Sequence, residues 1–260
     1  MTRLDVAHHA MMEDDANNAA RLNFYSQLAD AELFILLDDE DDQGQIKPRL
    51  FELEEGPIVL AFDLEERLSN FAGGPAPYAA LPGRVIAAQL AGQGVGLGLN
   101  VGDAPSSIIL PAEVMDWLAE TLGTKPIRVA AVPQGFAFPW GVPPEMTQKL
   151  MEKLSSNPGQ ADAVLLSEVV YEGGRRGHIL AVLGAIAGSE AALSGAVSEA
   201  IIFSGLDMGE IDVVFLGNDD PRVKTIGDVA LRLDLPKLVA SPIVDPKVPG
   251  MDPRKPPILR

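Results

Sequence analysis

Residues 56–68 of the chain read GPIVLAFDLEERL, and this stretch decides the class of fold. A Gly-Pro pair marks a turn, and the apolar run from Pro57 to Phe62 predicts a buried β-strand. Asp63 and Glu66 have the spacing of a capping box, an N-cap oxygen with a carboxylate three residues later. A helix is therefore expected to begin at Asp63, directly after the strand. A strand that leads at once into a helix indicates an α/β protein.

The rest of the first half supplies further elements around this stretch. The acidic run DDEDDQG at residues 38–44 is expected to form an exposed turn between two strands. Apolar periodicity predicts helices at residues 1–30, 83–90 and 111–122. Further strands are predicted at residues 31–37, 49–53, 94–100 and 107–110, with a loop at 72–78.

The second half of the chain also alternates predicted strands and helices, but its sequence differs from that of the first half. Strands are predicted at residues 127–132, 161–171, 178–183 and 210–216, the last being the final strand of the chain. The segment EGGRRG predicts a hairpin turn between the second and third of these. A loop is expected at residues 134–144, then a helix at 145–154 and another that Ser189 caps.

Together these elements predict an α/β (α+β) fold with two small mixed β-sheet domains whose helices pack on the sheets. A chain of 260 residues is long enough for two domains. We expect the first at residues 1–123 and the second at 124–235, before an extended proline-rich tail at 236–260. The tail is locally basic, so we expect it to lie across an acidic surface of its own chain or of a second copy. A homo-oligomer formed through the tail would be one outcome.

The composition of the chain limits the classes of partner that it is expected to bind. A formal net charge of −17, with no basic patch in the folded part, argues against nucleic-acid and membrane-surface binding. The chain has no cysteine, which excludes disulfides, thiol catalysis and thiolate metal sites. The first residues lack the apolar segment of a secretory signal, and the longest apolar run, residues 179–188, is too short to span a bilayer. We expect a cytoplasmic protein.

Most motifs of binding and catalysis are missing. An EF-hand loop laid on Asp39 fails where Leu50 replaces the bidentate glutamate, so a solvated turn is favoured. Glycines at 92, 94, 96 and 98 do not form a nucleotide-binding loop and are expected to allow close packing on one face of a strand. The three histidines, His8, His9 and His178, have no evident partner for catalysis. No metal or other cofactor is expected.

Two exposed segments could bind a partner. Phe136, Phe138 and Trp140 form a cluster in a chain with few aromatics, and such clusters concentrate at interfaces. The equal alternative is that the three side chains fill the seam between the domains. Arg175 and Arg176 could hold an anion, although a solvated hairpin tip is the favoured interpretation.

Four segments carry a family resemblance: AELFILLD, PRLFELEEGPIVLAFDLEERLSNF, GVGLGLNVG and the helix opened by LPAEV. Read together, they resemble the enhanced-serine-sensitivity (SseB) family, whose N-terminal domain would cover roughly residues 20–123. The second half looks like the C-terminal domain of that family. The resemblance implies no reaction and no catalytic residues, because the family is named for a growth phenotype. The chain departs from the family at Val101, where proline often follows the asparagine.

Three functions follow as hypotheses. The leading one is a non-enzymatic protein that binds other proteins through a sheet edge or through the aromatic cluster. The second is a small-molecule sensor, which the phenotype connects with amino-acid metabolism, whose pocket lies near Asn100 and Asp103. Asn100 has the commoner alternative of capping its own turn. The last is a hydrolase or transferase that uses Asp63, Glu65 or Asp103 as acid or base.

Overall fold

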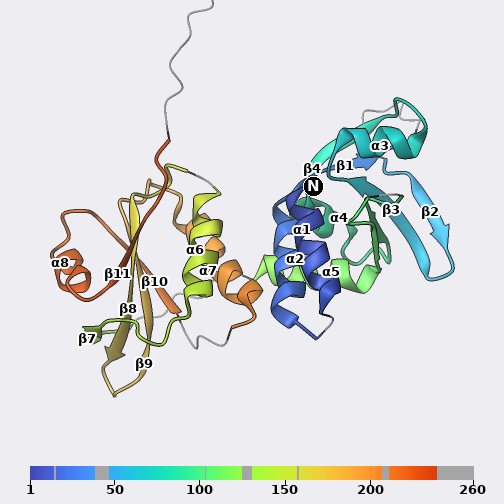
Figure 1. The fold of residues 1–260 in the computed structure, drawn as a ribbon. Helices are drawn as coiled ribbons and strands as arrows, with labels where there is room; N and C mark the ends of the chain where they lie inside the picture. The colour runs from blue at the N-terminus through green and yellow to red at the C-terminus, as the bar shows by residue number, and fades with distance from the viewer. Residues whose placement is uncertain are drawn as a thin grey trace, which may run out of the picture.

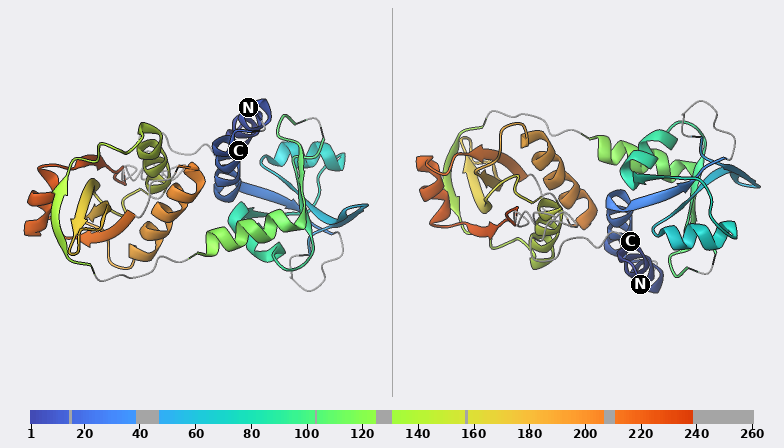
Figure 2. Two further views of the ribbon diagram at one scale, coloured as in Figure 1. Left: turned by 90° about the horizontal axis from the view of Figure 1, so that it is seen from below. Right: turned by 90° about the horizontal axis from the view of Figure 1, so that it is seen from above.

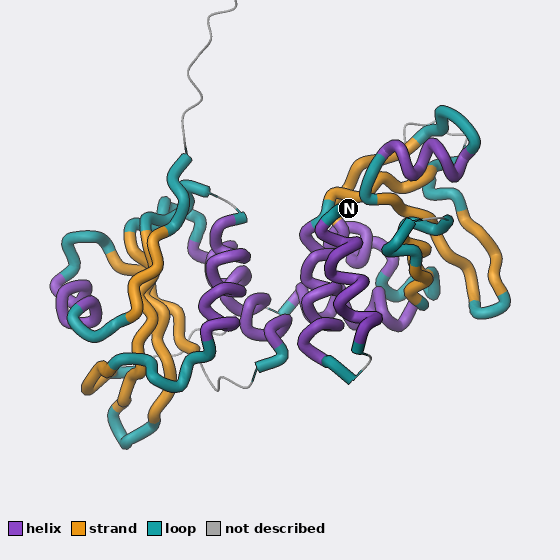
Figure 3. Tube along the Cα trace, viewed as in Figure 1, coloured by secondary structure: helices purple, strands orange, loops and turns teal. Residues whose placement is uncertain are grey.

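The computed structural model describes residues 1–14, 16–38, 47–102, 104–124, 131–156, 158–206 and 211–238. It contains two mixed β-sheets, each with helices on both faces (Figure 1), so the predicted α/β class is confirmed. We call residues 1–124 the N-terminal lobe and residues 131–238 the C-terminal lobe. The two sheets stand at opposite ends of the molecule, and helices of both lobes meet between them (Figures 1 and 3).

The N-terminal lobe is built on a six-stranded sheet in the order β4-β1-β3-β5-β6, with β2 beside β3. The neighbours β3 and β5 are parallel, and the other strand pairs are antiparallel. Its strands are β1 (Glu32–Leu36), β2 (Leu50–Leu53), β3 (Gly56–Phe62), β4 (Tyr78–Pro82), β5 (Gly96–Leu99) and β6 (Ile108–Leu110). Its helices are α1 (Arg3–Glu13), α2 (Asn18–Asp30), α3 (Glu65–Ala72), α4 (Gly83–Leu90) and α5 (Ala112–Gly123).

The C-terminal lobe is built on a five-stranded sheet in the order β10-β9-β8-β11, with β7 also beside β8. The pair β9 and β10 is parallel, and the predicted hairpin of β8 and β9 is confirmed. Its strands are β7 (Pro133–Ala137), β8 (Ala163–Tyr171), β9 (Arg176–Leu183), β10 (Ile211–Leu216) and β11 (Leu231–Asp234). Its helices are α6 (Pro144–Ser155), α7 (Glu190–Ser204) and α8 (Pro221–Gly227).

Several predicted boundaries are wrong. The N-terminal segment forms two helices rather than one, and β4, α8 and β11 occur where no element was expected. The helix after β3 is capped at Leu64 without a side-chain hydrogen bond, because the Asp63 carboxylate instead binds Thr2 and Arg67. The strand predicted at 127–132 falls mostly outside the described residues, and β7 occupies part of the predicted loop.

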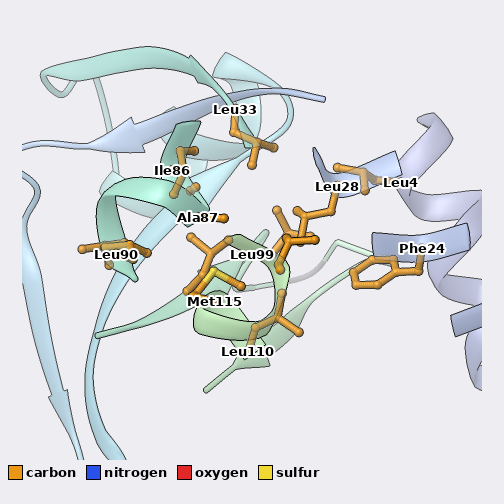
Figure 4. Packing of buried hydrophobic residues seen from close by; sticks show 14 of the residues in the cluster. Leu4, Phe24, Leu28, Leu33, Ile86, Ala87, Leu90, Leu99, Leu110 and Met115 are labelled. Atoms are coloured by element: carbon orange, nitrogen blue, oxygen red, sulfur yellow. The ribbon is translucent and has the colours of Figure 1, made fainter. Parts of the chain in front are cut away.

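The core of the N-terminal lobe lies between its sheet and the helices α1, α2, α4 and α5. Leu99 of β5 and Met115 of α5 are fully buried there, beside Leu28 and Phe24 of α2 (Figure 4). The opposite face of the sheet is covered by the shorter α3, through Leu68. In the C-terminal lobe, α6 and α7 cover one face of the sheet and α8 part of the other.

Two of the four glycines predicted to permit close packing, Gly96 and Gly98, lie in β5 and do so. Gly92 and Gly94 precede the strand, with φ of 73° and 68° and open space around them, so the prediction is wrong for these two. A Cβ atom at Gly96 would lie 2.5 Å from the Leu110 carbonyl oxygen of the neighbouring strand. At Gly98, the missing side chain is replaced by Leu60 and Val101, whose methyl groups would lie 2.5 and 3.0 Å from a Cβ. Both glycines therefore make room for residues of the same lobe.

Gly96→Ala should destabilise the protein by about 1–3 kcal/mol, the usual cost of overpacking, because the Leu110 backbone cannot move aside. Urea unfolding measures the change. Gly195→Ala in α7 is the matched control: its Cβ would meet nothing within 4 Å, and alanine should stabilise the helix by about 0.5–1 kcal/mol. Equal effects of the two substitutions would contradict the packing described for β5.

The two lobes share a hydrophobic seam. Phe203 of α7 is fully buried within the core cluster of the N-terminal lobe. Its ring meets Trp117 of α5 edge-on at 6.4 Å, and Trp117 in turn meets Tyr25 of α2 at 5.1 Å. Figure 2 shows α7 against the helices of the N-terminal lobe from two further directions. The C-terminal lobe thus completes the core of the N-terminal one.

Beside Phe203, four charged side chains form a closed ring across the seam. Glu199 of α7 accepts two hydrogen bonds from Arg84 of α4, at 2.8 and 3.1 Å, and one from Lys153 of α6 at 2.9 Å. Asp30 of α2 binds both cations as well, with a distance of 2.6 Å to the Lys153 ammonium. Each lobe contributes one cation and one anion, and the ring is electrically neutral.

The ring makes stability depend on pH. Burial disfavours the charged form of Glu199, but the hydrogen bonds and charges of Arg84 and Lys153 outweigh it and hold the carboxyl pKa below its usual value. A carboxyl group with a lowered folded-state pKa stabilises the protein above its unfolded-state value, about 4.3 for glutamate, and loses this contribution as pH falls.

Glu199→Gln should cost about 3 kcal/mol at pH 7, because it leaves two seam cations with one carboxylate. The difference from the unsubstituted protein should shrink as pH falls below about 4. Urea unfolding between pH 3 and 7 measures both effects. Glu120→Gln, at an exposed position of α5, is the control and should stay within about 0.5 kcal/mol throughout. A cost that does not vary with pH would rule out the ionised ring as its source.

Candidate functional site

A buried polar network lies where the parallel strands β3 and β5 end. Asp63 follows β3, and Asn100 follows β5 with a left-handed φ of 49° and 1% exposure. The Asn100 side-chain oxygen accepts a hydrogen bond from the Asp63 backbone N–H at 3.0 Å. Its amide nitrogen donates to the Ser106 hydroxyl at 2.8 Å. Asn100 therefore fastens the two strand ends together. This role is structural, but the Asn100 oxygen caps the residue after β3 rather than its own turn, which the sequence had favoured.

Arg67 of α3 is the centre of this network. Its guanidinium group donates to both oxygens of Asp5 at 2.9 and 2.6 Å and to Asp63 at 2.8 Å. Burial opposes the ionised form of Asp5, but hydrogen bonds from Arg67 and Ser106 outweigh it and hold the carboxyl pKa far below its usual range. The network thereby ties α1 to α3 across the edge of the sheet.

Within the described residues, side chains occupy the face of β5 on which a pocket near Asn100 was expected. Ile58, Leu60 and Val101 fill the face that the β5 glycines leave bare. Asp103, the other residue predicted to line this pocket, lies outside the described residues.

An open pocket of about 610 Å³ lies next to the network instead. Thr2 and Asp63 belong to both, and Phe34 and Leu64 give the pocket an apolar part. Its carboxylates outnumber its one cation, Arg3; they belong to Asp30, Glu32, Asp63, Glu65 and Glu66. This lining suits a ligand that carries a positive charge.

Two of the three carboxylates proposed for acid or base catalysis, Asp63 and Glu65, have partners in the structure. The Thr2 hydroxyl donates to Asp63 at 2.5 Å, and Arg67 pairs with it as well. The hydrogen bond to Glu65 raises the pKa of the Tyr78 phenol, so Glu65 is paired with Tyr78.

The three predicted aromatic residues separate into two environments. Phe136 is half-buried in β7 and packs with Val169 of β8. Phe138 and Trp140, beyond the end of β7, are 39% and 84% exposed, and their ring centroids lie 4.6 Å apart. We call these two rings the aromatic pair. The seam alternative is therefore wrong for Phe138 and Trp140, because both rings are exposed while Phe203 is the ring buried at the seam.

A tight turn holds the aromatic pair together. The Trp140 backbone N–H donates to the Phe138 carbonyl oxygen at 2.9 Å, which closes a three-residue γ-turn around Pro139. Proline fixes its own φ, so the turn loses little conformational freedom when it forms. A second bond, from the Val142 N–H to the Pro139 carbonyl at 3.2 Å, continues the chain toward α6.

The two arginines of the β8–β9 hairpin are both paired with carboxylates. Arg175 donates to Asp212 at 3.3 Å and lies over the Tyr171 ring at 4.2 Å. Arg176 lies 3.5 Å from Glu168. An anion at the predicted site would have to compete with these carboxylates.

The described residues do not indicate a metal site. Within the described residues, no group of three or more His, Asp or Glu side chains is arranged to hold a metal ion. Most of the acidic turn at 38–44 lies outside them. His8 is buried and meets Phe24 edge-on at 5.7 Å, and His178 has a buried Nδ1 atom with no hydrogen-bond partner in the described part of the chain.

Fold and network together define a two-lobed α/β protein whose N-terminal strand ends are closed by a polar network. None of the described helices has the length and apolar character needed to cross a membrane. Residues 4–116 match the family described as SseB protein N-terminal domain. This match confirms the resemblance to the SseB family for the N-terminal domain. The likeness of its second half to the family's C-terminal domain stays a prediction. No curated protein and no solved structure matches the chain.

Proposed function

We propose that this protein binds other proteins through the aromatic pair, Phe138 and Trp140, and acts in the cytoplasm without catalysing a reaction. The observation that supports the proposal is the 84% exposure of Trp140. Only two of the 260 residues are tryptophan, and the other one, Trp117, is 36% exposed and contacts the Phe203 and Tyr25 rings. A reducing compartment suits a chain without cysteine.

The geometry favours binding because the two rings are already held in place, so little conformational entropy is lost when a partner binds. Tryptophan and phenylalanine bury large areas with few rotatable bonds, and interface residues of this kind often dominate affinity. The γ-turn around Pro139 already holds the two rings together, which lowers the entropic cost of association. An exposed apolar pair on an otherwise acidic protein is also costly to leave in water.

The combined substitution Phe138→Ala/Trp140→Ala should abolish capture of a protein partner without unfolding the chain, since both rings are at the surface. Affinity purification of the tagged full chain with quantitative mass spectrometry measures the loss, and truncating such anchors usually costs 2 kcal/mol or more, about thirtyfold in affinity. Ile186→Ala is the matched control, because Ile186 is another exposed apolar residue of the C-terminal lobe. Partners that the double variant retains at full yield would remove the aromatic pair from the function.

The pocket supports a second candidate function, the binding of a small amino compound. Its volume of about 610 Å³ is in the range of small-molecule sites, and its carboxylates suit an ammonium group while Arg3 could meet a carboxylate. Asp30 lines the pocket and also belongs to the seam ring. A bound ammonium group would therefore compete with Arg84 and Lys153 for that carboxylate.

A thermal-shift screen with free amino acids tests the second candidate. A true ligand at about 100 times its Kd adds roughly 2.7 kcal/mol of stability. Glu32→Gln/Glu66→Gln should remove that shift, because it takes two carboxylates from the pocket. Glu54→Gln/Glu55→Gln removes two acidic residues outside the pocket and should preserve the shift. If no amino acid raises the melting temperature, the pocket has no such ligand.

A further inference from the structure

One carboxylate belongs both to the acidic pocket and to the seam between the lobes. Asp30, the last residue of α2, lines the pocket, and its two oxygens bind Arg84 and Lys153 in the seam ring. With both cations in place, the Asp30 side chain is still 32% exposed. A cation in the pocket therefore has access to a group that the seam uses.

Two ion pairs of the ring cross the seam, and Asp30 makes one of them. The Lys153 ammonium lies 2.6 Å from Asp30, and the Arg84 guanidinium lies 2.8 Å from Glu199. The other two pairs of the ring each stay within one lobe. All four residues are described, whereas the basic tail, expected to lie across an acidic surface, is outside the described residues from residue 239 on. Loss of the contact between Asp30 and Lys153 would leave the ring with a single ion pair across the seam.

The Lys153 side chain shows which kind of ligand Asp30 accepts. It is an ammonium group on four methylene groups, and it donates to Asp30 at 2.6 Å and to Glu199 at 2.9 Å. A primary ammonium group that enters from the pocket presents the same chemistry to the same carboxylate. Two ammonium groups on one carboxylate repel each other, so each weakens the binding of the other.

The rest of the pocket lining favours an amino acid with a basic side chain. Five carboxylates and one guanidinium line the pocket, so a molecule with a net positive charge is attracted more strongly than a neutral zwitterion. The guanidinium of Arg3 matches an α-carboxylate, and the carboxylates of Glu32 and Glu66 match an α-ammonium group. The apolar side chains of Phe34 and Leu64 match a chain of methylene groups.

We propose that the pocket binds a basic amino acid such as free lysine, whose side-chain ammonium competes with Lys153 for Asp30 and thereby loosens the seam. This inference rests on the second candidate function, the binding of an amino compound in the same pocket. Coupling between two sites is reciprocal. A closed seam therefore lowers the affinity for the amino acid by the factor by which the amino acid weakens the seam. The pocket thus regulates the contact between the lobes.

The first test is isothermal titration calorimetry on the full chain in low-salt buffer. L-Lysine is the probe, and L-norleucine, which lacks only the side-chain ammonium, should bind about fivefold more weakly, the upper end for a partly exposed ion pair. Lys153→Met removes the competing ammonium and should tighten L-lysine binding about tenfold. Lys149→Met is the matched control and should leave the affinity unchanged, because Lys149 of the same helix binds Asn23, outside the pocket.

A second measurement needs no substitution, so it decides the question even if Lys153→Met does not fold. The Lys153 ammonium lies 5.6 Å from the centre of the Phe203 ring, and that ring contacts Trp117. In the chain labelled with 5-fluorotryptophan, saturating L-lysine should move the fluorine resonance of Trp117 and leave that of the exposed Trp140 in place. L-Norleucine at the same concentration should move neither.

Three results would overturn this inference. Equal affinity of L-lysine for Lys153→Met and for the unsubstituted chain would show that the pocket and the ring are not coupled, as would a Trp117 resonance that ignores L-lysine. Equal affinity for L-lysine and L-norleucine would show that the side-chain ammonium is not recognised. In each case, a thermal shift that Glu32→Gln/Glu66→Gln removes would still support the binding of an amino compound. If no amino acid binds, both proposals fail together.

Discussion

The ring of Asp30, Arg84, Lys153 and Glu199 is the constraint on which the arrangement of this protein depends. Each ion contacts two of opposite sign, one from its own lobe and one from the other, so the ring closes in one relative placement of the helices. Buried ion pairs add little net stability over well-packed apolar groups, but a misplaced partner leaves an uncompensated charge. Phe203 supplies the apolar stabilisation of the seam, and the ring fixes its register.

In the N-terminal lobe, too, buried charges are paired with charges of opposite sign. Arg67 satisfies two carboxylates that would otherwise be buried without a counter-ion. Asn100 donates to the Ser106 hydroxyl, which donates in turn to Asp5. The strand ends where α/β proteins often place ligands are therefore closed here by the chain itself. The binding functions proposed above use other surfaces, namely the acidic pocket next to the network and the aromatic pair on the other lobe.

The elements predicted correctly are those that short-range sequence patterns determine. The strand at 57–62 and the glycine-rich strand at 94–100 follow from apolar runs and turn residues, and both occur close to those bounds. The seam ring could not be predicted, because Arg84 and Glu199 lie 115 positions apart and each looks like an ordinary surface charge on its helix. Strand β4 was missed because it ends in proline and exists only by pairing with β1. The exposure of Trp140 likewise depends on which residues fill the seam, and single-sequence patterns do not show that.

The burial of Phe203 in the first lobe has a consequence for how the chain is made. Ribosomes release the N-terminus first, at about 5–20 residues per second, and Phe203 follows Leu118 by about 85 positions. The socket that Phe203 fills therefore stays open for roughly 4–17 s of synthesis, with apolar side chains of α2 and α5 exposed to solvent. The N-terminal lobe is fully synthesised before Phe203 is available to complete its core. Nascent chains of this protein are thus natural clients for chaperones that cover apolar surface during translation.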